Sequence, residues 1–476
     1  MDSMFARCPV GLPVGARVRP HSARTPSPDT QPAAGKRLAG TFAARTGRRR
    51  VPGAGLRATA AIALVITSLT LAAAPTPLTL AEAQRVAVER SRQLAAQDMD
   101  ATAARASAVA AGQLPDPVLK AGIQNLPVDG VDRFSLTRDF MTMQSVGVMQ
   151  EFTRADKRAA RVRRFEREAD KARAEREAGA TMIARDTAVA WLDRHYAETT
   201  RLVIAEHVTA ARHDVEGAEA LYRAGRGQLA EIIAARQALV MLDDRVLALE
   251  RRRRAAQVVL ERWVGERADA PLEGPPDIGR LRRNPEDLER NLRQDPQLRV
   301  LESDAALATA DVDVARAARH GDWSVEVMYN RRGPAYSNMI SLNVSVPLPW
   351  DRANRQDREV TAKLAGVDRA EALLEERRRA RVAELRALEV EWQSVRERRN
   401  AIRDRLVPLA ADRTEATLAA YRGARATLTD VLGARRGEID VRLQLLELES
   451  DLARAWAELE FAWHTDAPLA GAGSGS

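Results

Sequence analysis

The sequence predicts a mainly α-helical protein with a small β part and an internal duplication. Three features lead to this prediction: two helical stretches of roughly 70 residues, two pairs of short alternating runs, and a correspondence between the two halves of the chain. At 1.5 Å per residue, each long helix would extend for about 105 Å, which is too long for an ordinary globular domain.

The first 74 residues carry the whole excess of positive charge. The chain of 476 residues has a formal charge of +8, and residues 1–74 hold 11 Lys/Arg against 2 Asp/Glu, a net charge of +9. The remaining residues carry 63 basic and 64 acidic side chains, a net charge of −1. A body with nearly balanced charges has no basic surface for phosphate backbones, so we expect no nucleic acid as a partner.

The same extension is typical of an export signal. Arginines at 45–50 precede an apolar run over 58–71, and three alanines at 72–74 form a small-residue cleavage site. A transmembrane anchor is the alternative, although the run is shorter than the roughly 20 apolar residues of a spanning helix. We therefore interpret 1–74 as an N-terminal extension with a signal peptide. The single cysteine, Cys8, lies within it, so the mature protein would form no disulfide.

The rest of the chain is expected to contain two copies of one plan: a helix, two strands, a very long helix, a tight turn and another helix. Sliding the chain by 199 positions aligns Tyr222 with Tyr421 and Leu229 with Leu428. A Pro/Gly-rich segment separates the copies. The expected boundaries are 75–270 for the first helix–hairpin–helix repeat, 271–284 for the linker, 285–466 for the second repeat and 467–476 for a flexible tail.

Ala-rich helices are expected to open both copies, over about 79–112 and 285–318. The first has capping-box spacing from Thr79 to Glu82. The second has Asn284 as a candidate cap, followed by Pro and acidic residues in the first turn.

The long helices are expected over about 153–222 and 352–421. Apolar residues recur in them every seven positions, which favours side-by-side, coiled-coil-like packing. The residues in this pattern are Met182, Val189, Tyr196 and Val203 in the first copy and Leu388, Val395 and Ile402 in the second.

Four short segments are expected to be strands. Three alternate clearly between apolar and polar residues, as strands do when their two faces meet different surroundings, and the segment at 143–152 alternates less cleanly. The four segments lie near 119–124, 143–152, 323–330 and 340–346, with a turn at Gly333 and Pro334. The alternation fits a barrel wall between lipid and water, and it equally fits a half-buried hairpin of a soluble protein. Because lipid does not tolerate open strand edges, a membrane barrel would need strands from several chains.

These features together resemble the TolC-like outer-membrane factors over about residues 78–466. The most specific similarity is a Tyr-Arg segment at the turn of each copy, at 222–225 and 421–424. Further similar segments open the two copies, at 78–83 and 295–298. Three more resemble the branch of the family that serves heavy-metal efflux; they lie at 114–117, 141–143 and 346–350.

The resemblance implies a homotrimer in the outer membrane of a Gram-negative bacterium. Its twelve-strand transmembrane β-barrel would continue into an α-barrel tunnel that extends through the periplasm. The protein would be a passive exit duct, not an enzyme, without a cofactor. Its implied partners are outer-membrane lipid, a periplasmic adaptor (membrane fusion) protein and an inner-membrane pump.

Heavy-metal cations are the expected cargo of this duct. Organic compounds or a protein exported by type I secretion are alternatives, because duct walls say little about what passes through. A periplasmic structural coiled-coil protein is the alternative from another class, since the helices alone do not exclude it.

Residues with catalytic or metal-binding chemistry do not emerge from the sequence. No two histidines of the body are spaced i, i+4, and no H-E-x-x-H motif is present. The thioethers of Met141, Met143 and Met149 would suit Cu(I). Packing at the end of a strand is the preferred interpretation of these methionines, and we predict no catalytic, cofactor-binding or metal site.

Glu231 and Asp430 are the candidates for a channel gate. They occupy equivalent repeat positions just past the predicted turns, with Arg236 and Arg435 five residues further on. Rings of carboxylates select cations, and they can close a pore by bonding to neighbouring arginines. The alternative is a solvated helix face. The turns themselves are the expected tips for adaptor docking; their residues are Ala224, Gly225, Arg226, Gly423, Ala424 and Arg425.

Overall fold

The computed structural model describes residues 76–282 and 292–462, and the statements below refer to these residues. The expected signal peptide within 1–74, the candidate cap Asn284 and the tail at 467–476 lie outside the described residues.

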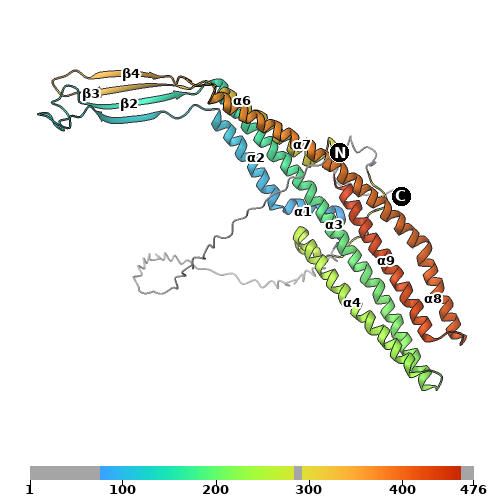
Figure 1. The fold of residues 1–476 in the computed structure, drawn as a ribbon. Helices are drawn as coiled ribbons and strands as arrows, with labels where there is room; N and C mark the ends of the chain where they lie inside the picture. The colour runs from blue at the N-terminus through green and yellow to red at the C-terminus, as the bar shows by residue number, and fades with distance from the viewer. Residues whose placement is uncertain (1–75, 283–291, 463–476) are drawn as a thin grey trace, which may run out of the picture. The chain divides into compact units, whose positions relative to one another are not determined.

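The predicted fold class is confirmed: the described chain is mostly helical and contains one four-stranded sheet (Figure 1). The first half contains α1 (Leu80–Arg90), α2 (Arg92–Ala111), β1 (Val118–Gln124), β2 (Met143–Phe152), α3 (Ala155–Arg223), α4 (Leu229–Val264) and the 3-10 helix η1 (Gly265–Asp269). The second half contains α6 (Pro296–Ala317), β3 (Trp323–Arg331), β4 (Met339–Ser345), α7 (Gln356–Ala401), the π-helical turn η3 (Ile402–Leu406), α8 (Val407–Arg422) and α9 (Leu428–Glu460).

The expectation of single opening helices was wrong in both copies. In the first copy Ser91 separates α1 from α2, because its backbone is extended and its hydroxyl accepts from Leu94 N at 3.2 Å as an N-cap. In the second copy the described helix begins at Pro296 instead of 285. Asp295 is its N-cap and accepts from the backbone N–H groups of Gln297 and Leu298.

The long helix of the first copy forms as predicted, whereas that of the second is interrupted. Helix α3 has 69 residues and is therefore about 104 Å long. Its counterpart changes to π-helical bonding at η3, where Val407 N–H bonds to Ile402 O. The cause is Pro408, which has no N–H to donate within a helix.

Helix α3 lies between α4 and α9, and α8 packs on the far side of α9 (Figure 1). Tyr196 of the predicted heptad pattern lies in the largest buried cluster, and Val189, Leu388 and Val395 pack against it. The heptad spacing therefore identified the buried seam in the middle of the long helices, whereas Met182 at the start of the pattern is exposed.

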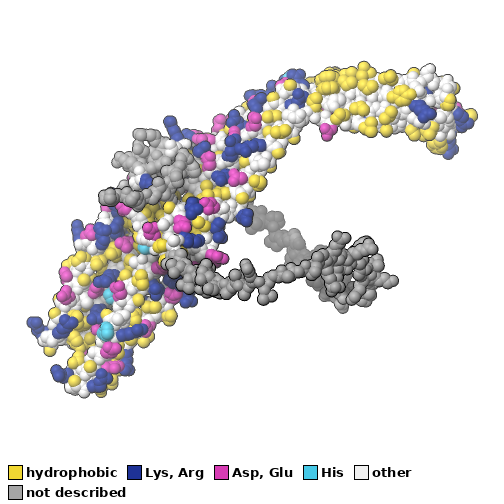
Figure 2. All heavy atoms as spheres, turned by 180° about the vertical axis from the view of Figure 1, so that it is seen from behind, with side chains coloured by type: hydrophobic (Ala, Val, Ile, Leu, Met, Phe, Trp, Pro, Cys, Tyr) yellow, Lys and Arg dark blue, Asp and Glu magenta, His cyan; other side chains and the backbone are white. Residues whose placement is uncertain are grey.

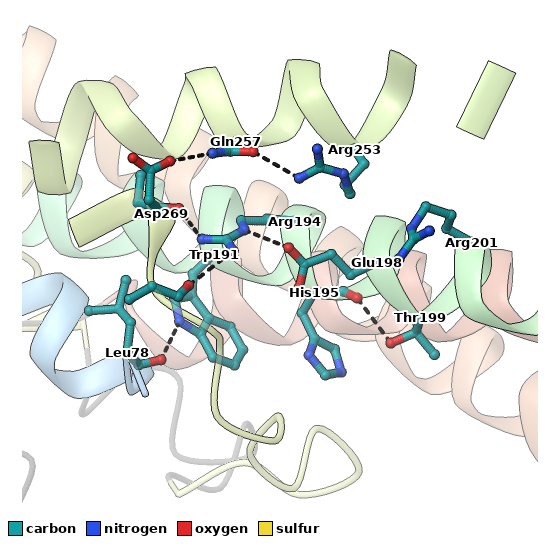
Figure 3. Close-up of polar contacts among 12 residues, drawn as sticks. Leu78, Trp191, Arg194, His195, Glu198, Thr199, Arg201, Arg253, Gln257 and Asp269 are labelled. Atoms are coloured by element: carbon teal, nitrogen blue, oxygen red, sulfur yellow. Dashed lines mark hydrogen bonds and ion pairs between the residues drawn. The ribbon is translucent and has the colours of Figure 1, made fainter. Parts of the chain in front are cut away.

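Three tryptophans bind the segment before α1 and the segment between the two repeats to the long helices. The indole N–H of Trp191 donates to Leu78 O at 3.0 Å, that of Trp392 to Ile278 O at 3.1 Å, and that of Trp456 to Arg280 O at 2.9 Å. Arg194, which is almost fully buried, donates to the carbonyls of Ala268 and Ala270 (Figure 3). These bonds satisfy carbonyls that have no partner in a helix or sheet.

The sheet is an antiparallel meander in the order β1-β2-β3-β4. Residues Val327 and Leu342 pair across β3 and β4, and Val148 pairs with Val327 from the other side. Because the order is open, β1 and β4 each have one edge without a partner strand within the chain. No helix among the described residues is long and apolar enough to cross a membrane.

Candidate functional site

The two faces of the sheet differ in chemistry along all four strands. Because paired residues point to the same side, the register places one continuous apolar face on the sheet. This face is largely exposed, and hydrophobic side chains cover the sheet in Figure 2. Its apolar residues are Leu119, Ala121, Ile123, Val146, Val148, Val325, Val327, Tyr329, Ile340, Leu342 and Val344. Gln144, Gln150 and Arg331 lie on the same side, toward the ends of β2 and β3. We call it the apolar face.

The opposite face, which we call the polar face, has more buried positions and satisfied polar groups. Lys120 Nζ and Glu326 form an ion pair at 2.7 Å, and Asn330 donates to the hydroxyl of Ser341 at 2.8 Å. Asn330 and Ser145 are buried, although they lie on the surface of a single layer of strands. This burial shows that side chains crowd on the polar face, as they do on the inner side of a curved sheet.

Aromatic side chains border the apolar face where the sheet joins the helices. Phe152 is the last residue of β2, and Trp323 is the first residue of β3, which pairs with it. The two rings stack with their centroids 4.4 Å apart. Trp350, just after β4, is strongly exposed. Amphipathic rings at the limits of an apolar band are typical of the membrane–water interface.

The turns at the opposite ends of the long helices have the same hydrogen bonds in both repeats. In the first repeat Gly225 N donates to Tyr222 O and Arg226 N to Leu221 O, both at 2.9 Å. The equivalent groups of Ala424 and Arg425 make the same bonds, at 2.9 and 2.8 Å.

This turn requires a left-handed residue. Gly225 has φ +70° and Ala424 has φ +54°, so Ala424 adopts a conformation that glycine would adopt with less strain. The expected tip residues Ala224 and Gly423, which precede these positions, have ordinary negative φ values. The repeat therefore preserves the turn geometry although the glycine has moved by one position.

Glu231 and Asp430 each close a capping box at the start of a helix. The backbone N–H of Gln228 donates to the Glu231 carboxylate at 3.1 Å, and that of Thr427 donates to Asp430 at 2.9 Å. The bonds from Thr427 hold the pKa of Asp430 below its usual value. Both carboxylates are thus fixed by local structure at the tips, and their role in a gate stays a prediction.

Arg236 and Arg435 bind other carboxylates than the two that the sequence suggested. Arg236 pairs with Glu219 at 2.7 Å, and Arg435 pairs with Asp214 at 2.9 Å. Both partners lie on α3, so these pairs tie α4 and α9 to the same central helix. Within the described parts of the chain, Arg226 and Arg425 have no ion-pair partner.

The pair between Arg435 and Asp214 borders a cavity of about 320 Å³ between α3, α4 and α9. Burial raises the pKa of Asp214 despite the opposing attraction of Arg435. Burial also lowers the pKa of His207, which lines the same cavity. Both residues lie on the side of α3 that carries Ile204, Val208 and Ala211 into the second apolar cluster. Neither was identified from the sequence; titratable groups within such an apolar stripe are the signal that could have found them.

The methionines considered for copper do not form one cluster. Met141 lies in the loop before β2 and is exposed, whereas Met143 and Met149 point from the polar face of β2, six residues apart. Across residues 76–282 and 292–462, no group of three or more His, Cys, Asp or Glu side chains could hold a metal ion.

A four-stranded sheet with one apolar face, joined to a helix about 104 Å long, is the arrangement expected of a membrane channel that continues into a helical tunnel. Residues 288–464 match the family model described as outer membrane efflux protein. Compared by sequence alone with curated proteins, the chain matches none.

Solved structures of outer-membrane channels share the fold. CusC superposes with a TM-score of 0.69 at 15% identity, covering 82% of this chain and 92% of CusC. The outer-membrane channel OprN gives 0.67 at 17% identity, covering 80% and 89%. The outer membrane protein VceC of Vibrio cholerae gives 0.64 at 19% identity, covering 80% and 95%.

These findings agree with the resemblance to the TolC-like outer-membrane factors: the second repeat matches the family model for outer membrane efflux proteins, and the fold is that of solved outer-membrane channels.

Proposed function

We propose that the protein is the outer-membrane exit duct of a tripartite efflux system, with heavy-metal cations as its cargo. The observation that carries the proposal is the sheet: an apolar face and a polar face on four strands with two open edges. Since lipid excludes unpaired backbone groups, β1 of one chain must pair with β4 of another. Three chains would close a barrel of twelve strands with the polar face inside.

The helices also support association between chains. Helix α4 packs on α3, and its outer side exposes Ile233, Val240 and Leu247, which are 57%, 66% and 71% accessible. These residues are seven positions apart, the spacing of a coiled-coil seam. A neighbouring protomer would cover this stripe and complete the wall of the tunnel.

The cargo proposal draws on the charge inside the barrel and on the segments similar to the heavy-metal branch. The polar face carries Lys120, Glu326 and Glu151, a net charge of −1 per chain, which favours cations. An adaptor would dock at the tips formed by Ala224, Gly225, Arg226, Gly423, Ala424 and Arg425, and an inner-membrane pump would supply the energy.

Crosslinking of the detergent-extracted outer membrane should yield a three-chain species, and the purified trimer should conduct cations in planar bilayers. A monomer recovered from the soluble periplasmic fraction would contradict the duct and favour a structural coiled-coil protein. Cargo is tested separately, by comparing the metal tolerance and drug tolerance of cells with and without the gene.

For the gate, we expect Glu231→Gln combined with Asp430→Asn to raise single-channel conductance and reduce cation preference. The amides can still accept the capping bonds, so the variant removes charge with little loss of helix stability. Trimer yield should not change, because the tips are far from the sheet along α3.

A matched variant separates loss of charge from loss of ion pairs. Arg236→Gln with Arg435→Gln breaks the partly exposed pair to Glu219, worth at most about 1 kcal/mol, and the more buried pair to Asp214, which solvent screens less. It should raise conductance but increase cation preference. If neither variant changes conductance or selectivity, the constriction lies elsewhere.

A further inference from the structure

Four methionines lie on the polar face of the sheet, one on each of four successive cross-strand rows. Successive rows on one face are separated by two residues, or about 7 Å along the strand. The chain has only ten methionines, and the apolar face of the strands has none. In order along the sheet, the rows contain Met143 (opposite Gln124), Met339 (opposite Asn330), Met328 (opposite Gly147) and Met149 (opposite Glu326).

Three of these methionines are neighbours on adjacent strands. Met149 of β2 is diagonal to Met328 of β3, and Met328 is diagonal to Met339 of β4. Diagonal residues of an antiparallel sheet have their Cβ atoms roughly 7–8 Å apart, which long side chains can bridge. Their thioethers can therefore approach one another in pairs.

Gly147 makes room for the central methionine. A Cβ atom at Gly147 would lie 2.5 Å from Met328 Cγ, so the Met328 side chain lies across β2 at this point. Met328 is only 8% accessible although it faces the side that would be the lumen. Its side chain is therefore directed toward the strand that carries Met149.

The charges around Met149, Met328 and Met339 suit a cation that passes along the face without binding tightly. Lys120 neutralises Glu326, which pairs with Met149 across the strands, and Glu151 leaves the face with its net negative charge. Thioethers are uncharged, soft ligands that prefer Cu(I) and similar ions. Neutral ligands in pairs hold such ions less firmly than the thiolates of a storage site would.

We propose that Met149, Met328 and Met339 form a low-affinity path for soft monovalent cations, Cu(I) or Ag(I), along the inner wall of the barrel. The path rests on the proposed function, because it requires the polar face to line a conducting pore. The path narrows the proposed cargo from heavy-metal cations to thiophilic ions, which the side chains of the sheet would recognise.

The test uses Ag(I) as the probe and the detergent-purified trimer. The triple variant Met149→Leu, Met328→Leu, Met339→Leu keeps side-chain size and removes the sulfurs. The matched control is Met99→Leu, Met182→Leu, Met241→Leu, which removes three partly exposed helical methionines. Titration calorimetry with silver nitrate measures binding, and planar bilayers in potassium nitrate measure the current with and without Ag(I).

The parent and the control should bind Ag(I), and Ag(I) should slow their potassium current. In the triple variant we expect the dissociation constant to rise by about tenfold or more, and the effect of Ag(I) on the current to disappear. Equal Ag(I) binding by the triple variant and the parent, or an equal loss in the helical control, overturns the path. Potassium current without Ag(I) should match in all three proteins; its absence from the parent overturns the duct itself.

Discussion

Val327→Arg and Leu342→Arg are each expected to prevent assembly in the outer membrane. Val327 and Leu342 face each other on the middle rows of β3 and β4, and both point to the apolar face. An arginine on the lipid side of a barrel costs about 2–4 kcal/mol near the bilayer midplane, and a trimer would contain three copies of the substitution. Heat-resistant trimer in the outer-membrane fraction is the quantity to measure.

Asn343→Arg is the matched control, because residue 343 is next to Leu342 and points to the polar face. It should leave the trimer yield near that of the parent, since a solvated lumen accommodates the charge. If the substitutions at 342 and 343 have equal effects, the two faces are assigned wrongly and the sheet does not separate lipid from water.

Asp295→Ala is expected to cause the largest loss of stability in the helical part. Asp295 is fully buried, accepts from Arg381 Nε at 2.7 Å, and caps α6 through Gln297 N at 2.8 Å. Removing one partner of a buried ion pair costs about 3–5 kcal/mol, because the other charge stays buried without compensation. Chemical denaturation of the detergent-solubilised protein, monitored by the helical signal, measures the loss.

Two further variants separate the parts of this effect. Asp295→Asn keeps an oxygen for the cap and removes the charge, so its loss should be smaller than that of alanine. Asp304→Ala, on the same helix, breaks a partly exposed pair with Lys171 and should cost at most about 1 kcal/mol. A loss for Asp295→Ala no larger than for Asp304→Ala would show that the buried pair contributes no special stability.

The sequence was sufficient wherever a local pattern decides the structure. Alternation of period two located all four strands, because each strand has two faces with different surroundings. Heptad spacing placed Tyr196 and Val189 on the buried side of α3, because residues seven apart lie on one side of a helix. Tyr222 and Tyr421 likewise marked the turns that the two repeats share.

Local patterns did not predict helix breaks that a single residue causes within a segment of otherwise helix-favouring residues. Ser91 divides the first opening helix, and Pro408 forces the π-helical turn, yet both lie in sequence with strong helical preference. The sequence places Ala424 opposite Gly225 at the offset of 199 residues, but it did not show which conformation the alanine adopts there. The left-handed conformation is imposed by the bonds of the turn, which outweigh the preference of alanine.

By itself, then, the sequence determined the four strands, the first long helix and the duplication, and it carried the resemblance to a family of channels, because these follow from periodicity and from short turn segments. Only the tertiary structure decided which charges meet. Arg236 and Arg435 pair with Glu219 and Asp214 of α3, while Glu231 and Asp430 cap their own helices. The diagonal arrangement of Met149, Met328 and Met339 likewise appears only in the strand register. Such contacts join residues far apart in the chain, and it is the packing of α3 between α4 and α9, and of β3 between β2 and β4, that brings them together.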